Sequence, residues 1–248
     1  MAIDRERLAR EAVEAETLRR SDAMKTVVLR AVSHDLRTPL MAILTSASAL
    51  AREDLELDRE DRSELVATIL GEAGRLDRLV ANLLDLSRLQ AGAAQPEPDV
   101  WAVDDLVVQA LDEVGEPGRR VEVTFPEESL TVRADAAQVE RVLVNLIENA
   151  LKYSPPDEPV RVQVAATVSN VLIRVVDHGP GIADADRERI FEPFQRAADG
   201  AVRGAGLGLA IARGFANANG GHVWAESEGR EGSTFVLALP LAVTQSQP

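Results

Sequence analysis

Two long segments with helical apolar spacing come first in this chain, at about residues 4–51 and 63–90. This spacing predicts two amphipathic helices, and the charge-rich stretch between them predicts a turn, so the pair should form a hairpin. A single hairpin would leave much apolar surface uncovered. Two chains are therefore expected to pair into a four-helix bundle, which predicts a homodimer. The apolar positions of the second segment are Leu65, Ile69, Leu76, Leu79, Leu83, Leu86 and Leu89.

A proline interrupts the first segment at Pro39. Proline removes a backbone donor and costs about 3 kcal/mol inside a helix. The alternative is that the helix ends here. However, helical spacing resumes at once with Leu40, Ile43 and Leu44, so we expect a continuing helix with a bend just after His34.

Small residues and two prolines at residues 91–98 predict a linker after the second helix. The linker divides the chain into a helical domain at residues 1–94 and a second domain at residues 95–248.

In the second domain the pattern alternates between strands and helices. Helices are predicted at residues 103–114, 136–152 and 206–218. Strands are predicted at 120–125, 130–134, 160–168, 171–177, 222–227 and 233–239. Helices on one face of a mixed sheet form an α/β sandwich, so the whole chain is predicted to be α+β.

Composition limits the function classes. The net charge of −14 argues against a nucleic-acid-binding surface, which is normally basic. The chain has no cysteine, which excludes disulfides and thiol nucleophiles and is consistent with a reducing cytosol. It also has no run of about 18 apolar residues. We therefore expect a cytoplasmic chain that makes no membrane contact of its own.

A histidine and a carboxylate stand side by side at His34 and Asp35, on the first predicted helix. Imidazole is a good nucleophile, and a neighbouring acid can accept the Nδ1 proton and leave Nε2 free to attack. Thr38 lies one turn further on the same face. Its hydroxyl either takes part in chemistry or bonds back to its own helix.

Amide side chains recur on the helix predicted at residues 136–152. Asn145 and Asn149 are four residues apart, as are Glu148 and Lys152, so each pair shares a helix face. Amide oxygens suit Mg²⁺, which shares its coordination shell with phosphates. Taken alone, this pattern is more often an exposed polar stripe.

Two glycine-rich stretches follow. Asp177 ends an apolar strand and precedes Gly179 and Gly181, where the main chain can approach a ligand closely. Further on, glycines at 204, 206 and 208 precede a helix, whose N-terminus can bind phosphate. The second stretch is not a P-loop, because no Lys-Ser or Lys-Thr follows it.

With Phe191-Glu192-Pro193-Phe194 between the two glycine stretches, these segments stand in a fixed order. They resemble the H, N, G1, F and G2 boxes of bacterial sensor histidine kinases. Residues 21–40 look most similar to the potassium-responsive branch. The resemblance implies the GHKL ATP-binding sandwich shared with gyrase, the Hsp90 chaperone and mismatch-repair ATPases, with ATP and Mg²⁺ as cofactors.

The resemblance also implies roles for individual residues. His34 would accept the phosphoryl group, Asp35 would act as general base, and Thr38 would help to dephosphorylate the partner. Asn149 would bind the metal. Phe191 and Phe194 would dock the lid that follows Gly181 against the histidine domain, unless they form an ordinary small core. The implied nucleotide-binding residues are Asn145, Asn149, Lys152, Tyr153, Asp177, Gly179, Gly181, Gly204, Gly206, Leu207 and Gly208.

The function that the resemblance implies is an ATP-dependent protein-histidine kinase. It would phosphorylate His34 and pass the phosphoryl group to an aspartate of a response regulator, with a possible second activity as that regulator's phosphatase. The alternatives are a non-catalytic dimeric scaffold, or pseudokinase, and a GHKL-type ATPase. Only a short charged helix precedes the histidine segment, so either a sensing region, membrane-bound or not, has been removed or the signal arrives from a partner chain.

Overall fold

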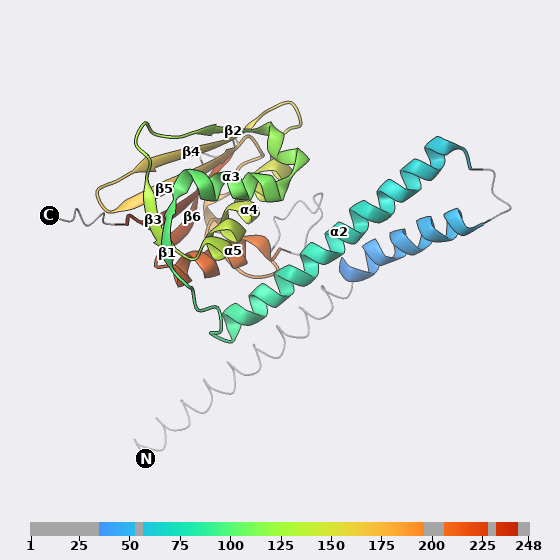
Figure 1. The fold of residues 1–248 in the computed structure, drawn as a ribbon, viewed down its shortest axis with the longest axis horizontal. Coiled ribbons are helices and arrows are strands. Elements are labelled where there is room, and N and C mark those ends of the chain that lie inside the picture. Colours follow the sequence, from blue (N-terminus) through green and yellow to red (C-terminus); the bar gives the residue numbers. More distant parts are fainter. Residues whose placement is uncertain (1–34, 53–56, 196–205, 228–231, 243–248) are drawn as a thin grey trace, which may run out of the picture. The chain divides into compact units, whose positions relative to one another are not determined.

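The computed structural model describes residues 35–52, 57–195, 206–227 and 232–242. The chain divides into two compact units, Met1–Val80 and Ala81–Pro248. The first is a helical hairpin and the second is an α/β unit, which confirms the predicted α+β class (Figure 1). The division falls inside helix α2 (Arg59–Gln90), so the last turns of that helix belong to the second unit.

The hairpin of the first unit confirms both predicted helices in their described parts. Residues 35–51 are helical without interruption, so the chain passes through Pro39 as a helix. The bend expected after His34 remains a prediction, because residues 1–34 lie outside the described part.

Helix α2 begins at Arg59, four residues before its predicted start. The reason is a reciprocal cap between Asp58 and Asp61, which lies within the charge-rich stretch that was predicted to be a turn. The Asp61 N–H donates to Oδ1 of Asp58 at 2.8 Å, and the Asp58 N–H donates to Oδ2 of Asp61 at 3.4 Å. These bonds satisfy N–H groups that the first turn of a helix leaves unpaired.

The second unit contains a five-stranded sheet in the order β2-β4-β5-β7-β6. Strands β2 and β4 are parallel, and the other neighbours are antiparallel. The bounds are β2 Val121–Thr124, β4 Val160–Ala166, β5 Asn170–Asp177, β6 His222–Glu226 and β7 Ser233–Pro240. The strand β3 (Thr131–Ala134) pairs instead with β1 (Asp99–Ala102) in a two-stranded sheet. Strand β1 was not predicted from the sequence, and it directly follows the prolines of the linker.

Three helices cover one face of the five-stranded sheet, which confirms the predicted sandwich (Figure 1). They are α3 (Val103–Val114), α4 (Ala136–Tyr153) and α5 (Gly208–Ala218), and α4 packs against both of the others. Leu143, Leu146 and Ile147 of α4 are fully buried. Burying such a side chain contributes about 1.5–3 kcal/mol, so α4 is held firmly in the layer.

The segment between β5 and α5 was predicted to be a lid. Its first part contains two short 3-10 helices, Asp184–Asp186 and Arg189–Phe191. The Ile182 N–H donates to Oγ of Ser227 at 3.0 Å, and Arg213 donates to the carbonyl of Phe191 at 3.0 Å. The chain up to Gln195 is therefore tied to the sandwich, while residues 196–205 lie outside the described part.

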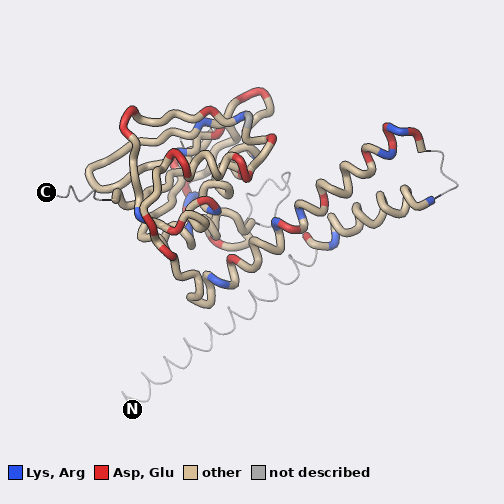
Figure 2. Tube along the Cα trace, in the orientation of Figure 1, with Lys and Arg blue, Asp and Glu red and all other residues tan. Residues whose placement is uncertain are grey.

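Charged side chains are spread along the described chain. Figure 2 shows Lys and Arg interspersed with Asp and Glu along both units rather than gathered on one element. Within the described residues, none of the helices has both the length and the apolar character needed to cross a bilayer.

Candidate nucleotide site

Helix α4 presents both predicted asparagines on one face. Its start is fixed by Asp135, whose side chain accepts a hydrogen bond from the Gln138 N–H at 3.1 Å. Asn145 is only 7% exposed, and its Nδ2 donates to the carbonyl of Arg141 at 2.7 Å. Asn149 follows one turn later and is half-buried. Asn145 is therefore the buried amide of the pair, and Asn149 is the one nearer the surface.

The C-terminal end of α4 brings Tyr153 beside the glycine segment, with Lys152 next to Tyr153. Lys152 is exposed, and its Nζ lies 5.0 Å from the centroid of the Tyr153 ring. A Cβ added to Gly179 would lie 3.0 Å from the carbonyl oxygen of Tyr153. The structure thus places the end of α4 directly against the turn after β5.

Asp177 is the buried carboxylate of the site. It ends β5 and is 4% exposed. Its Oδ1 accepts hydrogen bonds from the N–H groups of Gly179 at 2.8 Å and Ser233 at 3.2 Å. Burial raises the pKa of Asp177 above its ordinary value, and these two bonds and the neighbouring His178 partly oppose that shift. A buried carboxylate with a perturbed pKa marks a candidate functional site.

Glycines are required here because side chains would collide with the groups of the site. A Cβ on Gly179 would lie 2.8 Å from Oδ1 of Asp177, and one on Gly208 would lie 2.6 Å from Oδ1 of Asn145. Gly206 has a φ of +68°, and a Cβ there would lie 2.5 Å from the carbonyl of Gln195. The start of α5 therefore lies against Asn145, and the N–H groups of a helix N-terminus can bind a phosphate.

Gly181 and Leu207, two further residues predicted to bind the nucleotide, lie in different surroundings. Gly181 lies in the turn after Asp177, with a φ of 77°. Gly204 lies outside the described residues. Leu207 is 1% exposed and belongs to the hydrophobic core. Its side chain is thus occupied by packing, so a contact between Leu207 and a nucleotide would come from its main chain.

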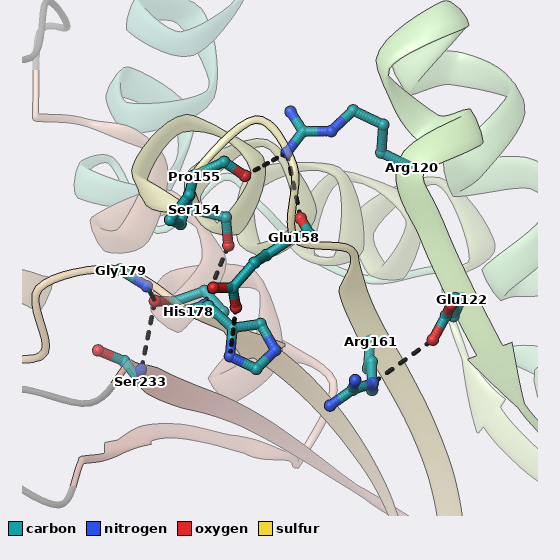
Figure 3. A network of polar contacts seen from close by, with 10 residues as sticks. Arg120, Glu122, Ser154, Pro155, Glu158, Arg161, His178, Gly179 and Ser233 are labelled. Carbon is teal, nitrogen blue, oxygen red and sulfur yellow. Dashed lines mark hydrogen bonds and ion pairs between the residues drawn. The ribbon is translucent and has the colours of Figure 1, made fainter.

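A polar network joins the loop after α4 to the turn after β5 (Figure 3). The His178 N–H donates to Oγ of Ser154 at 3.0 Å, and its Nδ1 lies 3.1 Å from Oε2 of Glu158. Arg120 donates to the carbonyls of Pro155 at 2.7 Å and Glu158 at 3.2 Å. His178 was predicted to have no specific role, and its partners Ser154 and Glu158 are too far away in sequence for a spacing rule to reveal them.

Strand β7 completes the support of Asp177. Besides the bond from Ser233, the Gly232 N–H donates to the carbonyl of Gly179 at 2.9 Å. A Cβ on Gly232 would lie 2.2 Å from the carbonyl oxygen of Asp177. Sequence reasoning missed these residues, since only the pairing of β5 with β7 brings them to the site.

The two phenylalanines lie in different surroundings. Phe191 is buried, and its ring meets that of Phe235 edge to face at a centroid distance of 6.4 Å. This favours the alternative of an ordinary core for Phe191 over a docking surface. Phe194 is half-buried against the same core, and its N–H donates to the carbonyl of Gly206 at 2.9 Å. It thereby ties the end of the lid's first part to the second glycine stretch.

The predicted phosphotransfer residues belong to the first unit. Asp35 is half-buried and Thr38 is exposed, both on the helix at residues 35–51. The prediction for His34 itself falls on a residue outside the described part.

Two family models match the chain. Residues 24–92 match the His Kinase A (phospho-acceptor) domain, which includes His34, Asp35 and Thr38. Residues 134–243 match the histidine kinase-, DNA gyrase B- and HSP90-like ATPase family, which includes the site built above. The chain belongs to the sensor histidine kinases. Its second unit is accordingly an ATP-binding domain of the GHKL type, as predicted.

Similar proteins indicate the branch of the family to which this chain is most alike. The sensor protein KdpD of Mycobacterium tuberculosis strain H37Rv is 42% identical over 241 residues, covering 94% of this chain and 28% of the relative. This confirms the predicted resemblance to the potassium-responsive branch. The chain thus spans less than a third of that relative's length.

Two solved structures share the fold. Histidine kinase AdeS of Acinetobacter baumannii aligns with a TM-score of 0.65 at 23% identity, covering 84% of this chain and 98% of that one. Full-length ShkA in complex with AMPPNP aligns with a TM-score of 0.60 at 29% identity, covering 86% of this chain and 45% of that one.

Proposed function

We propose that this chain is the kinase portion of a two-component sensor. It uses ATP to phosphorylate His34 and then passes the phosphoryl group to an aspartate on a response regulator. The observation that supports this best is the convergence of the α4 amides, buried Asp177 and the glycine turns in one unit, on a chain that also matches a phospho-acceptor domain.

The residues fit an adenine nucleotide. Asp177 offers a carboxylate that can accept a hydrogen bond from the adenine amino group. Because Gly179 has no side chain, its main chain packs directly against Asp177, and Gly208 likewise lets α5 begin directly against Asn145. Lys152, at the exposed end of α4, supplies a positive charge for phosphate. These features support ATP as the substrate of the second unit.

The amide chemistry of α4 fits Mg²⁺ as well. Asn149 is the half-buried member of the pair and is proposed to hold the ion, with Asn145 behind it. When bound together with ATP, Mg²⁺ neutralises charge on the phosphates.

The proposed transfer is a displacement at phosphorus. Nε2 of His34 attacks the γ-phosphorus, a P–N bond forms, and the bond from that phosphorus to the bridging oxygen breaks. ADP leaves with the electron pair of that bond. Asp35 holds Nδ1–H in the starting state and takes this proton as phosphohistidine forms.

The remaining assignments extend this proposal. The helical domain is proposed to cover residues 1–94 and the catalytic domain residues 95–248. Thr38, exposed one turn from His34, is proposed to position water for dephosphorylating the regulator. The chain is proposed to act in the cytoplasm, and its signal to come from a sensing region or a partner chain. The family matches favour this kinase over a scaffold or a chaperone-like ATPase.

Incubation of the full chain with γ-labelled ATP tests the proposal. Label should enter the protein only when Mg²⁺ is present, and it should survive alkali and be lost in acid, as expected for a phosphoramidate. A receiver domain added afterwards should take up the label, and its decay with wild type or Thr38→Ala tests the phosphatase role. Binding of ATP without any labelling would leave the scaffold as the better description.

We also expect a dimer held by the first unit. Leu40, Leu44, Val66 and Leu70 are exposed in the single chain, with Leu70 at 68%. Light scattering should give roughly twice the chain mass of 26.7 kDa. Leu70→Glu should shift the protein toward monomer, because it places a charge on the expected interface. Val168→Glu is the matched control, since Val168 is fully exposed at a hairpin of the second unit. A wild-type chain that is monomeric at micromolar concentration would contradict the bundle.

A further inference from the structure

Arg141, on the first half of α4, makes an unusually well-held ion pair with the end of α2. Its Nε and Nη2 both donate to Oδ2 of Asp85, at 3.1 and 3.0 Å, and Nη2 also donates to Oδ1 of Asn82 at 3.0 Å. The Arg141 and Asp85 side chains are 26% and 14% exposed, whereas those of Arg174 and Glu226 in another ion pair are 34% and 45% exposed. The fork of a guanidinium suits this double contact, and an ammonium group could not reproduce it.

The last turns of α2 are themselves fixed on the second unit. Leu86 is buried in its core, and Leu83 and Leu89 pack against that core. On α5, a Cβ added to Gly214 would lie 2.6 Å from Cδ1 of Leu89. The end of α2 therefore contacts α5 through apolar packing and α4 through Arg141. These contacts hold both helices of the nucleotide site in position relative to α2.

Arg141 is connected to the site through its main chain. Its carbonyl accepts the hydrogen bond from Nδ2 of Asn145 at 2.7 Å. That bond sets the direction of the Asn145 amide, whose Oδ1 lies against Gly208 at the start of α5. A shift or rotation of α4 at Arg141 would therefore move Asn145 relative to the helix start that is proposed to meet phosphate.

We propose that Arg141 is a positioning residue for nucleotide binding. Held by Asp85 and Asn82, it keeps Asn145 in place against Gly208 and so couples the last turns of α2 to the ATP site. The proposal rests on nucleotide binding at this site, but it does not depend on phosphorylation of His34.

The test measures binding of a fluorescent ATP analogue to the full chain. Arg141→Gln and Asp85→Asn should each weaken binding by about threefold to tenfold. The double variant should be no weaker than the single ones, because each substitution removes the same clamp. Arg141→Lys should recover part of the affinity. Arg174→Gln is the matched control, since it breaks the pair with Glu226 elsewhere in the unit and should leave affinity within about twofold.

A merely structural ion pair would behave differently. Arg141→Gln and Arg174→Gln would then both lower the melting temperature, by no more than about 4 °C, and both would leave affinity unchanged. That result, or additive losses of affinity in the double variant, would overturn the proposal. If Arg141→Gln did not fold, the affinities of Asp85→Asn and Arg141→Lys for the ATP analogue would still test the proposal. A wild-type chain that binds the analogue but never phosphorylates itself would refute the kinase proposal alone.

Discussion

Replacing His34 with glutamine should abolish incorporation of label from γ-labelled ATP. Glutamine is close in size to histidine, but its amide nitrogen is not a nucleophile at neutral pH, so no P–N bond can form. Because the nucleotide site lies in the other unit, affinity for an ATP analogue should stay within about twofold of wild type. Phosphorimaging after gel separation measures the first quantity, and fluorescence titration measures the second.

The chain offers matched controls for this experiment, because it contains only three histidines. His222 lies exposed at the start of β6, where its ring stacks on Trp224 at a centroid distance of 6.0 Å. His222→Gln should therefore label normally. Undiminished labelling of His34→Gln, or loss of labelling in His222→Gln with ATP binding intact, would place the phosphoryl group on another residue.

The elements that the sequence predicted best are those whose pattern is local. The alternating β-branched runs gave β4 and β5, and the apolar spacing of α4 placed its start correctly at Ala136 and its end within one residue. Asn145 and Asn149 could be paired because helical geometry alone decides which residues share a face. Asp177 could be placed at the end of a strand because an apolar run precedes it, but its burial was not predicted.

The features that were missed depend on contacts between distant segments. Arg141 resembles any helical arginine in the sequence, and its two partners are more than 50 residues away. Ser233 supports Asp177 only because β7 pairs with β5. Strand β1 owes its existence to pairing with β3, so its four residues have too little pattern of their own. In contrast, the cap at Asp58 could have been found, because an acidic residue three positions later is a known signal of a helix start.

Asp177→Asn should weaken ATP binding strongly without destabilising the fold. Asparagine has nearly the same shape, and its oxygen can still accept the bonds from Gly179 and Ser233. Its amide nitrogen, however, would point a donor at the adenine amino group, which is also a donor. Losing a charge-assisted bond costs about 1.5–3 kcal/mol, so affinity for ATP should fall by about tenfold to a hundredfold.

The free energy of unfolding of Asp177→Asn should not fall with its affinity for ATP. Burial raises the pKa of Asp177 above 3.8, so the folded protein binds this proton more tightly than the unfolded chain does. The contribution of Asp177 to the free energy of unfolding is therefore greatest below pH 3.8 and declines as pH rises through the folded pKa. At neutral pH the ionised group is a net cost that a neutral amide removes. The variant should unfold at the same urea concentration as wild type or a higher one.

Acid titration gives this prediction a second, independent test. ATP affinity of the wild type should fall as the pH drops through the raised pKa of Asp177, whereas the much weaker affinity of Asp177→Asn should show less pH dependence. Asp184→Asn is the matched control, because Asp184 is an exposed carboxylate, paired with Arg187, beyond the same turn. It should keep both the affinity and the pH dependence of wild type. If Asp177→Asn instead bound ATP as wild type does, or lost stability at neutral pH, the carboxylate would be a structural group of the β5–β7 junction rather than the adenine contact.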